Sequence, residues 1–136
     1  GNNVYGPNQY PEKLIPRFIK LLKKNKKVTI QGQGTAVRAF LHSYDTARAF
    51  ECILEKGKIG EIYNIGCDEG MEFSVMEVAK ILIKLIKKTE DYDEWVEYVE
   101  DRPFNDQRYY ISNQKLKDLG WTITIDFLDG LKKLLV

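Results

Sequence analysis

The chain has 136 residues, a length typical of one domain, and 43% of them are hydrophobic, enough for a buried core. The 21 lysines and arginines nearly balance the 20 aspartates and glutamates, so the formal net charge is +1. This balance creates no strong field that would attract nucleic acid or a membrane surface. We find no signal peptide and no apolar run of bilayer-spanning length. We therefore expect one cytoplasmic domain over 1–136, with neither nucleic acid nor membrane as a partner.

The residue counts also argue against metal chemistry. Cys52 and Cys67 are the two cysteines, without CxxC spacing, and His42 is the single histidine. Structural zinc sites draw four ligands mainly from these residue types. We therefore expect no metal site and two reduced thiols, as is usual in the cytosol.

The first third of the chain predicts extended segments on either side of a helix. After a proline-punctuated extended opening, a helix is expected to begin at Pro16, because proline fits a first helical position. Its apolar stripe is formed by Phe18, Ile19 and Leu22. The segments "KVTIQG" (27–32) and "AVRAFLH" (36–42) predict strands separated by a turn.

The middle of the chain predicts two amphipathic helices. Asp45 is expected to cap the first helix, which ends at Gly57. The expected apolar stripe of this helix is Ala49, Phe50, Ile53 and Leu54. Ser74 and Glu77 have the spacing of a capping box and predict the start of the second helix. Between the two helices, "EIYNIG" (61–66) predicts a short strand.

The last third continues the alternation of strands and helices. "EWVEYVE" (94–100) predicts a strand, a short helix is expected from Ser112 to Gly120, and "TITI" (122–125) is expected to be extended before a final helix capped by Asp126. Alternating elements favour an α/β fold. The strands are too short and too few for a full doubly wound sheet, so we expect a small lobe that packs on a larger body.

Several catalytic patterns are missing from the sequence. It contains neither a GxGxxG fingerprint nor a P-loop, and none of its eight tyrosines has a lysine four residues later. A single histidine gives no convincing Ser–His–Asp set. For His42 we favour a structural or surface role over catalysis, and for Asp45 a helix cap over acid–base work. We therefore assign no catalytic residue to this chain.

Arginines in loops and strands offer anion binding instead. Arg38 interrupts an apolar strand, and Arg102 and Arg108 share the stretch "DRPFNDQRYY". A guanidinium grips phosphate oxygens in a bidentate geometry that lysine cannot match, so arginines converging from separate loops would suit a diphosphate. The alternative is that the loop arginines pair with Asp101 and Asp106, and spacing alone favours that alternative.

Amides and one lysine are further ligand candidates. Asn3, Asn64 and Asn105 lie on loops or strand ends, where amides bind ligand hydroxyls or cap turns with similar frequency. Lys13 lies between two prolines, where its ammonium could serve a phosphate. The run "KKNKK" (23–27) could suggest nucleic acid, but without clustered aromatic residues a solvated helix end is favoured.

Taken in order, these segments resemble those of nucleotide-sugar 4,6-dehydratases, extended short-chain dehydrogenases typified by dTDP-glucose 4,6-dehydratase. "NNVYGPNQYPEKLIPRFI" is similar to the family's "NNYGPYQFPEKLIP", and "VTIQGQGTAVRAFLHSYDTARAF" to its "YGxGxxxRDxLYVxDxxxA". "GEIYNIG" and "LGW" also match, and the resemblance covers essentially the whole chain. "DRPFNDQRY" resembles "DRPGHDxRY", which is the match most specific to the 4,6-dehydratase branch.

The resemblance implies a substrate-binding role. The match begins after the family's tyrosine–lysine motif, so we expect a C-terminal substrate-binding lobe, a fragment of a larger enzyme without its N-terminal Rossmann domain. The parent would be a homodimeric, NAD-dependent lyase of deoxysugar biosynthesis, acting on dTDP-glucose or UDP-glucose. The chain alone is expected to be inactive and to bind no NAD.

The family's nucleoside diphosphate contacts can be transferred position by position. The resemblance implies substrate binding by ten residues: Asn3, Lys13, Leu14, Thr29, Ile30, Gln31, Arg38, Asn64, Arg102 and Asn105. Arg38 and Arg102 would hold the phosphates, and residues 29–31 would line the base.

Some of these positions depart from the family pattern. Gln31 replaces a common base-stacking tyrosine, which leaves uracil as open as thymine. Phe104 and Asn105 replace glycine and histidine in the "DRP" loop, and Val4 replaces an asparagine that reaches the cofactor.

Two alternatives remain at this point. The lobe could belong to a related 4-epimerase or nucleotide-sugar decarboxylase, although "DRPFNDQRY" argues against this. The chain could also be a free-standing, non-catalytic binding or interaction module. If a Rossmann domain is missing, an apolar face should be bare, and the chain should tend to self-associate.

Overall fold

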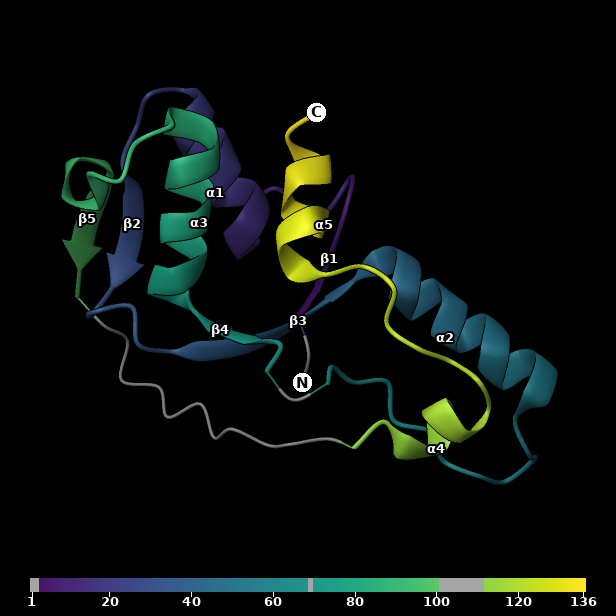
Figure 1. Ribbon diagram of the computed structural model, residues 1–136. Helices are drawn as coiled ribbons and strands as arrows, with labels where there is room; N and C mark the ends of the chain where they lie inside the picture. The colour runs from purple at the N-terminus through teal and green to yellow at the C-terminus, as the bar shows by residue number, and fades with distance from the viewer. Residues whose placement is uncertain (1–2, 69, 101–111) are drawn as a thin grey trace.

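The protein is an α/β structure, as expected, in a computed structural model that describes residues 3–68, 70–100 and 112–136. Figure 1 shows the course of the chain. The elements in order are β1 (Asn3–Tyr5), α1 (Leu14–Lys23), β2 (Val28–Gln31), β3 (Val37–His42), α2 (Ser43–Lys56), β4 (Glu72–Ser74), α3 (Val75–Lys87), the 3-10 helix η1 (Tyr92–Trp95), β5 (Val96–Val99), α4 (Gln114–Asp118) and α5 (Phe127–Leu134). Among these helices, none is long and apolar enough to cross a membrane.

The strands of the described ranges form two small sheets. In the first, β3 lies between β1, which runs parallel to it, and β4, which runs antiparallel. In the second, β2 and β5 pair in parallel. Figure 1 shows β2 and β5 at one end of the molecule beside α1 and α3, with α2 and α4 at the other end.

Strand β3 separates two hydrophobic clusters. Because side chains alternate along a strand, Phe40 points to one face and Leu41 to the other. Phe40 packs with buried residues of α1, α3 and α5, whereas Leu41 packs with Ala49, Leu116 and the completely buried Trp121. One six-residue strand therefore contributes side chains to both hydrophobic clusters and holds them together.

Helix α1 begins earlier than predicted. The expected start was Pro16, but the helix begins at Leu14 and places Pro16 in the third position. The first helical turn leaves its N–H groups without intrahelical acceptors, so proline is still tolerated there. The stripe prediction is confirmed for Phe18 and Leu22, which are buried, and Ile19 is partly buried against the same core.

Two predicted extended segments are not strands in the structure, and one is shorter than expected. Residues 61–66 and 122–125 have no strand partner in the described ranges. In the second of these segments, the backbone N–H groups of Thr124 and Ile125 donate to a side chain instead of a neighbouring strand. The predicted strand 94–100 begins with a 3-10 turn, and only Val96–Val99 pairs, with β2.

The capping predictions have mixed outcomes. The capping box of α3 is confirmed, with Ser74 Oγ accepting from the Glu77 N–H at 3.0 Å and the Glu77 carboxylate accepting from the Ser74 N–H at 3.0 Å. Asp126 is at the N-cap of α5, but its side chain makes no capping hydrogen bond there. The assignment of Asp45 as an N-cap is wrong, because His42 occupies that position of α2.

His42 has the structural role that was favoured for it. Its Nδ1 accepts a hydrogen bond from the Tyr44 N–H at 3.0 Å, and the ring is buried edge-on against Tyr5. Accepting this bond requires an unprotonated Nδ1. Burial lowers the pKa of His42, and Lys133 adds to this effect, while Asp45 partly opposes it.

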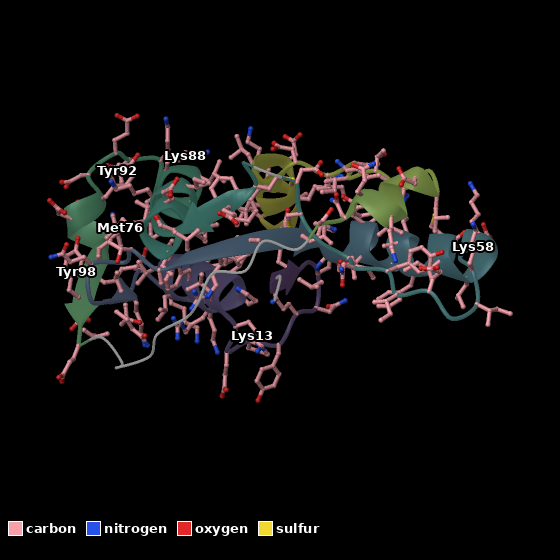
Figure 2. All side chains as sticks on the ribbon, turned by 90° about the horizontal axis from the view of Figure 1, so that it is seen from below. Lys13, Lys58, Met76, Lys88, Tyr92 and Tyr98 are labelled. Carbon is pink, nitrogen blue, oxygen red and sulfur yellow. The ribbon has the colours of Figure 1, made fainter. Side chains whose placement is uncertain are left out.

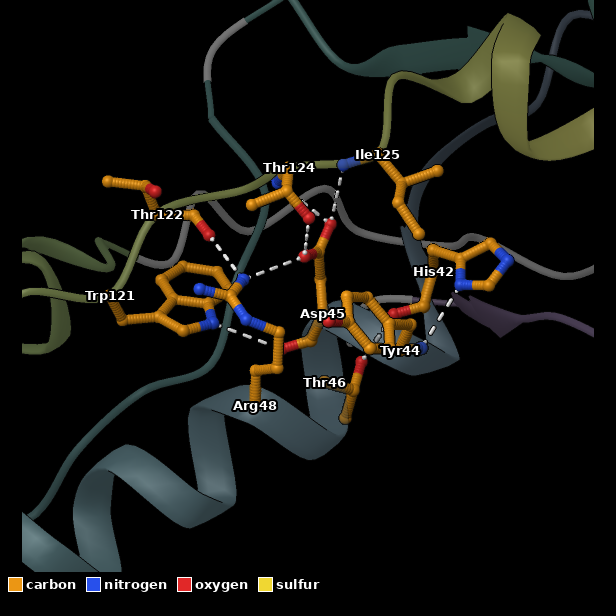
Figure 3. Close-up of polar contacts among 9 residues, drawn as sticks. All are labelled: His42, Tyr44, Asp45, Thr46, Arg48, Trp121, Thr122, Thr124 and Ile125. Atoms are coloured by element: carbon orange, nitrogen blue, oxygen red, sulfur yellow. Dashed lines mark hydrogen bonds and ion pairs between the residues drawn. The ribbon is translucent and has the colours of Figure 1, made fainter.

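Asp45 joins α2 to the segment that precedes α5 (Figure 3). Its completely buried carboxylate accepts from the Thr124 N–H, the Thr124 hydroxyl and the Ile125 N–H at 2.7–3.0 Å, and from Arg48 at 3.0 Å. Its backbone carbonyl accepts from the indole N–H of Trp121 at 3.0 Å. Burial raises the pKa of Asp45, but the hydrogen bonds that its carboxylate accepts from Thr124, Ile125 and Arg48 outweigh burial and hold the pKa below its usual value.

Only two of the four residues in the predicted apolar stripe of α2 pack against the core. Ala49 is buried and Ile53 packs against the second core, but Phe50 is 57% and Leu54 is 86% exposed. Ile59 and Ile62, in the segment after α2, are also exposed. These four side chains, Phe50, Leu54, Ile59 and Ile62, are called the α2 apolar patch below.

We predict that replacing Asp45 with asparagine lowers the free energy of unfolding by about 1.5–3 kcal/mol at neutral pH, the usual contribution of hydrogen bonds to a charged group. The folded-state pKa of Asp45 lies below its unfolded value, so its stabilisation is present above that value and is lost as the pH falls. Urea unfolding should therefore show a difference between the two proteins that shrinks below about pH 4.

Glu51→Gln is the matched control, because it removes a carboxylate from the exposed surface of the same helix. This control should leave stability nearly unchanged. An Asp45→Asn protein as stable as the unmodified chain at neutral pH would show that the buried carboxylate does not hold these segments together.

We predict that Gly130→Ala destabilises the protein by roughly 1–3 kcal/mol through overpacking. A Cβ at position 130 would lie 2.1 Å from the hydroxyl oxygen of Tyr5 and 2.9 Å from its Cζ. That hydroxyl is buried without a hydrogen-bond partner among the described residues, so Tyr5→Phe alone should cost little. In thermal unfolding, the double variant should recover part of the loss; a stabilised Gly130→Ala protein would contradict the close contact.

We predict that the chain self-associates through the α2 apolar patch. Light scattering on a sizing column should show an average mass that rises with concentration. Phe50→Ser with Leu54→Ser should reduce this rise, whereas Leu128→Ser with Val136→Ser, at two exposed apolar positions elsewhere, should not. A monodisperse monomer at every concentration would refute the prediction.

Candidate functional site

A cavity of about 280 Å³ opens where β1 and β3 meet the start of α1. The parallel pairing of these strands sets Val4 opposite Leu41 and brings Phe40 to the cavity wall. The lining residues are Val4, Tyr5, Gln9, Lys13, Leu14, Ile15 and Phe40. We call this space the Lys13 cavity. It brings together Lys13 and Leu14, two of the ten residues implied by the family resemblance.

The start of α1 gives the Lys13 cavity a positive character. Lys13 is the N-cap residue, and its exposed side chain lies at the border of the molecule in Figure 2, away from Lys58 and Tyr98. The first turn of α1 contains no acidic residue. A helix N-terminus presents unpaired N–H groups and the positive end of the helix dipole, and here an ammonium is added. This combination suits a phosphate or another small anion.

Gln9 is a cavity residue that the sequence analysis did not single out. Its amide nitrogen donates to the Val4 carbonyl at 2.9 Å, while its amide oxygen is buried and has no partner among the described residues. The only sequence signal was its place inside "YGPNQYPEK", a stretch whose periodicity is too weak to indicate which side chains turn inward.

Arg38 lies on the same face of β3 as Phe40, because residues two apart on a strand share a face. The strand rise separates the two residues by about 7 Å. Arg38 is half-buried, and its Nη1 donates to the Val37 carbonyl at 3.1 Å. The guanidinium is therefore tethered to the neighbouring backbone, and Arg38 does not line the Lys13 cavity.

The other predicted residues are spread over different elements. Thr29, Ile30 and Gln31 form most of β2, in the second sheet; Ile30 is fully buried in the core and Gln31 is exposed. Asn64 is exposed on the segment between α2 and β4. These four residues do not line the Lys13 cavity.

Three predicted residues lie partly or wholly outside the described part of the chain. The backbone of Asn3 belongs to β1 and pairs with Phe40, which puts it beside the cavity wall. Arg102 and Asn105 lie outside the described residues, together with the rest of 101–111.

The described residues offer neither a metal cluster nor an activated thiol. No group of three or more His, Cys, Asp or Glu side chains that could hold a metal ion occurs within the described ranges. Both cysteines are free, and burial raises the pKa of Cys67 to about 12, so its thiol stays protonated and donates to the Phe40 carbonyl. The polar side chains that line the Lys13 cavity, those of Tyr5, Gln9 and Lys13, are suited to binding and orienting a ligand.

Comparison with known proteins identifies the relatives of this chain. Residues 2–66 match the NAD dependent epimerase/dehydratase family. The chain is also 50% identical over 135 residues to a dTDP-D-glucose 4,6-dehydratase from Bos taurus, and this match covers 97% of the chain and 38% of the bovine protein. The chain is therefore similar to this family over residues 2–66 and to part of the bovine dehydratase over nearly its whole length.

A second relative is named for a different nucleotide. The chain is 50% identical over 133 residues to a trifunctional UDP-glucose 4,6-dehydratase/UDP-4-keto-6-deoxy-D-glucose 3,5-epimerase/UDP-4-keto-L-rhamnose-reductase from Arabidopsis thaliana. That match covers 98% of the chain and 19% of the plant protein. The chain thus spans well under half the length of the relatives it matches.

Solved structures of a nucleotide-sugar dehydratase and of an epimerase share the fold of the chain. A dTDP-glucose 4,6-dehydratase from Streptomyces venezuelae with NAD and TYD bound superposes with a TM-score of 0.86 and 36% identity, covering 98% of the chain and 40% of that protein. A UDP-glucuronic acid 4-epimerase from Bacillus cereus with UDP-glucuronic acid and NAD gives a TM-score of 0.81 and 30% identity, covering 96% of the chain and 40% of that protein. The resemblance to part of an extended short-chain dehydrogenase is thereby confirmed.

Proposed function

We propose that this chain is the substrate-binding part of an NAD-dependent nucleotide-sugar 4,6-dehydratase and that it holds the nucleoside diphosphate. The parent enzyme would be a lyase that makes a 4-keto-6-deoxy sugar nucleotide. The observation that carries this proposal is the 50% identity to a dTDP-D-glucose 4,6-dehydratase over 97% of the chain.

The geometry of the Lys13 cavity supports a role for it in binding the diphosphate end of the substrate. A lysine at a helix N-terminus and an arginine two residues along β3 from the cavity wall are suited to phosphate oxygens. Asn3, Thr29, Ile30, Gln31, Asn64, Arg102 and Asn105 are proposed as further substrate contacts on the family resemblance. Ile30 is buried, so any contact that it makes with a base would involve its backbone.

The proposal includes both dTDP-glucose and UDP-glucose as substrates. Relatives named for each nucleotide are 50% identical to the chain. Gln31 is exposed at the end of β2, where the family resemblance places a base-stacking tyrosine. An amide side chain provides no aromatic face, so discrimination between the two bases would have to come from hydrogen bonds or from other residues.

A 4-epimerase is the second candidate. The Bacillus cereus epimerase shares the fold, but its identity of 30% is lower than the 36% of the Streptomyces venezuelae dehydratase. The "DRPFNDQRY" segment also resembles the dehydratase pattern. These two observations favour the dehydratase.

NAD would supply the hydride chemistry of the parent enzyme, and we assign none of its contacts to this chain. The described glycines form no glycine-rich turn that opens a helix, which is the usual binding site for a dinucleotide pyrophosphate. The parent is proposed to carry its cofactor on a Rossmann domain and to act as a cytoplasmic homodimer. One substrate-binding domain over 1–136 remains part of the proposal.

We predict that Lys13→Ala and Arg38→Ala each weaken the binding of dTDP and UDP by about 1.5–3 kcal/mol, as for a lost charged hydrogen bond. Arg102→Ala is expected to act in the same direction. Calorimetric titration of the full chain would measure these affinities, with a DNA oligonucleotide as a test for general attraction of polyanions. Lys132→Ala removes an exposed cation from α5 and should have no effect.

Unchanged nucleotide affinity in all three variants would contradict the proposed phosphate contacts. Failure of both nucleotides to bind the unmodified chain would contradict the nucleotide-binding role itself. Tighter binding of DNA than of either nucleotide would favour the alternative of a non-catalytic binding module.

A further inference from the structure

A second and larger hollow lies beside α1, formed by residues that the proposed function does not use. Its volume is about 500 Å³. Its lining residues are Tyr10, Pro11, Glu12, Arg17, Lys20, Leu21, Lys24 and Lys26. We call it the Arg17 pocket. None of the ten substrate residues proposed above belongs to this lining.

The helix geometry explains why the cations of the Arg17 pocket converge. Arg17 and Lys20 in α1 and Lys24, the C-cap residue of α1, are spaced by three and four residues, so they share one face of the helix. The chain then turns back beyond α1, with the Lys26 N–H donating to the Leu21 carbonyl at 2.8 Å. This turn adds Lys26 to the same wall of the pocket.

The positive charges of the pocket are not neutralised by the described part of the protein. Four cationic side chains face a single acidic one, Glu12, giving a net charge of +3 for the lining. Within the described ranges, none of the four cations makes an ion pair or a side-chain hydrogen bond, and Arg17 Nε is buried without an acceptor. Like charges at these helical spacings destabilise a helix, so a bound anion would relieve their repulsion.

The pocket also has an apolar side. Tyr10 is 62% exposed, and together with Pro11 and Leu21 it forms a wall near the cations. A volume of about 500 Å³ lies in the range of small-molecule sites. Arginine and lysine bind phosphate oxygens, while an exposed aromatic ring can pack against an aromatic base.

We propose that the Arg17 pocket is a second binding site, for a small organic polyphosphate such as a nucleoside triphosphate. Arg17 and the lysines bind the phosphates, and Tyr10 packs against the ring system. A nucleic acid surface fits less well, because the site is a hollow with one aromatic residue and the chain has a net charge of only +1. The pocket is separate from the Lys13 cavity, since the two linings have no residue in common.

Calorimetric titration of the full chain with ATP and with inorganic pyrophosphate tests this proposal. The unmodified chain should bind both, and ATP more tightly because it adds the ring contact. Lys20→Gln combined with Lys24→Gln should weaken ATP binding by about tenfold or more, equivalent to ~1.4 kcal/mol. Tyr10→Ala should reduce the preference for ATP over pyrophosphate.

Lys23→Gln combined with Lys27→Gln is the matched control. It removes the same charge from exposed positions near the same helix that do not line the pocket, and it should change ATP binding little. A similar loss in both double variants would overturn the proposal, because it would indicate general charge attraction. Absence of ATP binding to the unmodified chain, or displacement of ATP by single-stranded DNA at lower concentration, would also overturn it.

The two binding sites can be distinguished by the same variants. Lys13→Ala should leave ATP binding intact, and the Lys20/Lys24 double variant should still bind dTDP at the Lys13 cavity. If Lys13→Ala loses dTDP binding but keeps ATP binding, the result supports two separate sites. Loss of ATP binding in Lys13→Ala would place ATP in the Lys13 cavity and refute a second site.

Discussion

The buried carboxylate of Asp45 is the interaction on which the arrangement of the elements most depends. It accepts hydrogen bonds from Thr124 and Ile125, which are far from it in sequence, and so ties the first turn of α2 to the segment before α5. A buried charge is costly unless it is paired and hydrogen-bonded, and three of the hydrogen bonds to this carboxylate come from the segment before α5. Moving α5 away from α2 would therefore remove the Thr124 and Ile125 donors and leave the buried charge to Arg48 on its own helix.

Strand β3 connects the Asp45 interaction to the Lys13 cavity, because β3 leads directly into α2 and its residue Phe40 lines the cavity. The strand ends at His42, which is also the N-cap residue of α2. The position of α2 therefore determines where the end of β3 lies. Phe40 stacks on Phe127 of α5 at a ring-centroid distance of 4.9 Å and also forms part of the cavity wall. The cavity is therefore held by packing from α5 on one side and by the pairing of β1 with β3 on the other.

The sequence predicted the elements whose signals are local. The capping box at Ser74 depends on residues three apart, and the α1 stripe depends on helical spacing, so both were visible without tertiary information. Asp45 was misassigned because an aspartate near a helix start has the same local pattern whether it caps that helix or bonds a distant backbone. Nothing in "TITI" showed that its N–H groups would donate to a carboxylate.

The candidate site was predictable to a similar extent. Lys13 and Leu14 came from the family resemblance, whereas Gln9 became visible only through its buried amide oxygen, a property of the packed structure. The α2 stripe shows the same limit, since Phe50 and Leu54 have the spacing of core residues and are nevertheless exposed. Periodicity indicates which residues share a face, but it cannot indicate what covers that face.

The distribution of charge along the chain also differs from what the net charge alone suggests. The formal net charge of +1 excludes a strong global field, yet residues 12–27 contain seven lysines and arginines and one glutamate. Exposed charges are screened within about 10 Å at moderate salt, so the local excess and not the total governs what α1 attracts. The helix carries cations both at its N-terminal end, beside the Lys13 cavity, and along the face that lines the Arg17 pocket. A single helix can therefore present two positively charged surfaces in a chain that is nearly neutral overall.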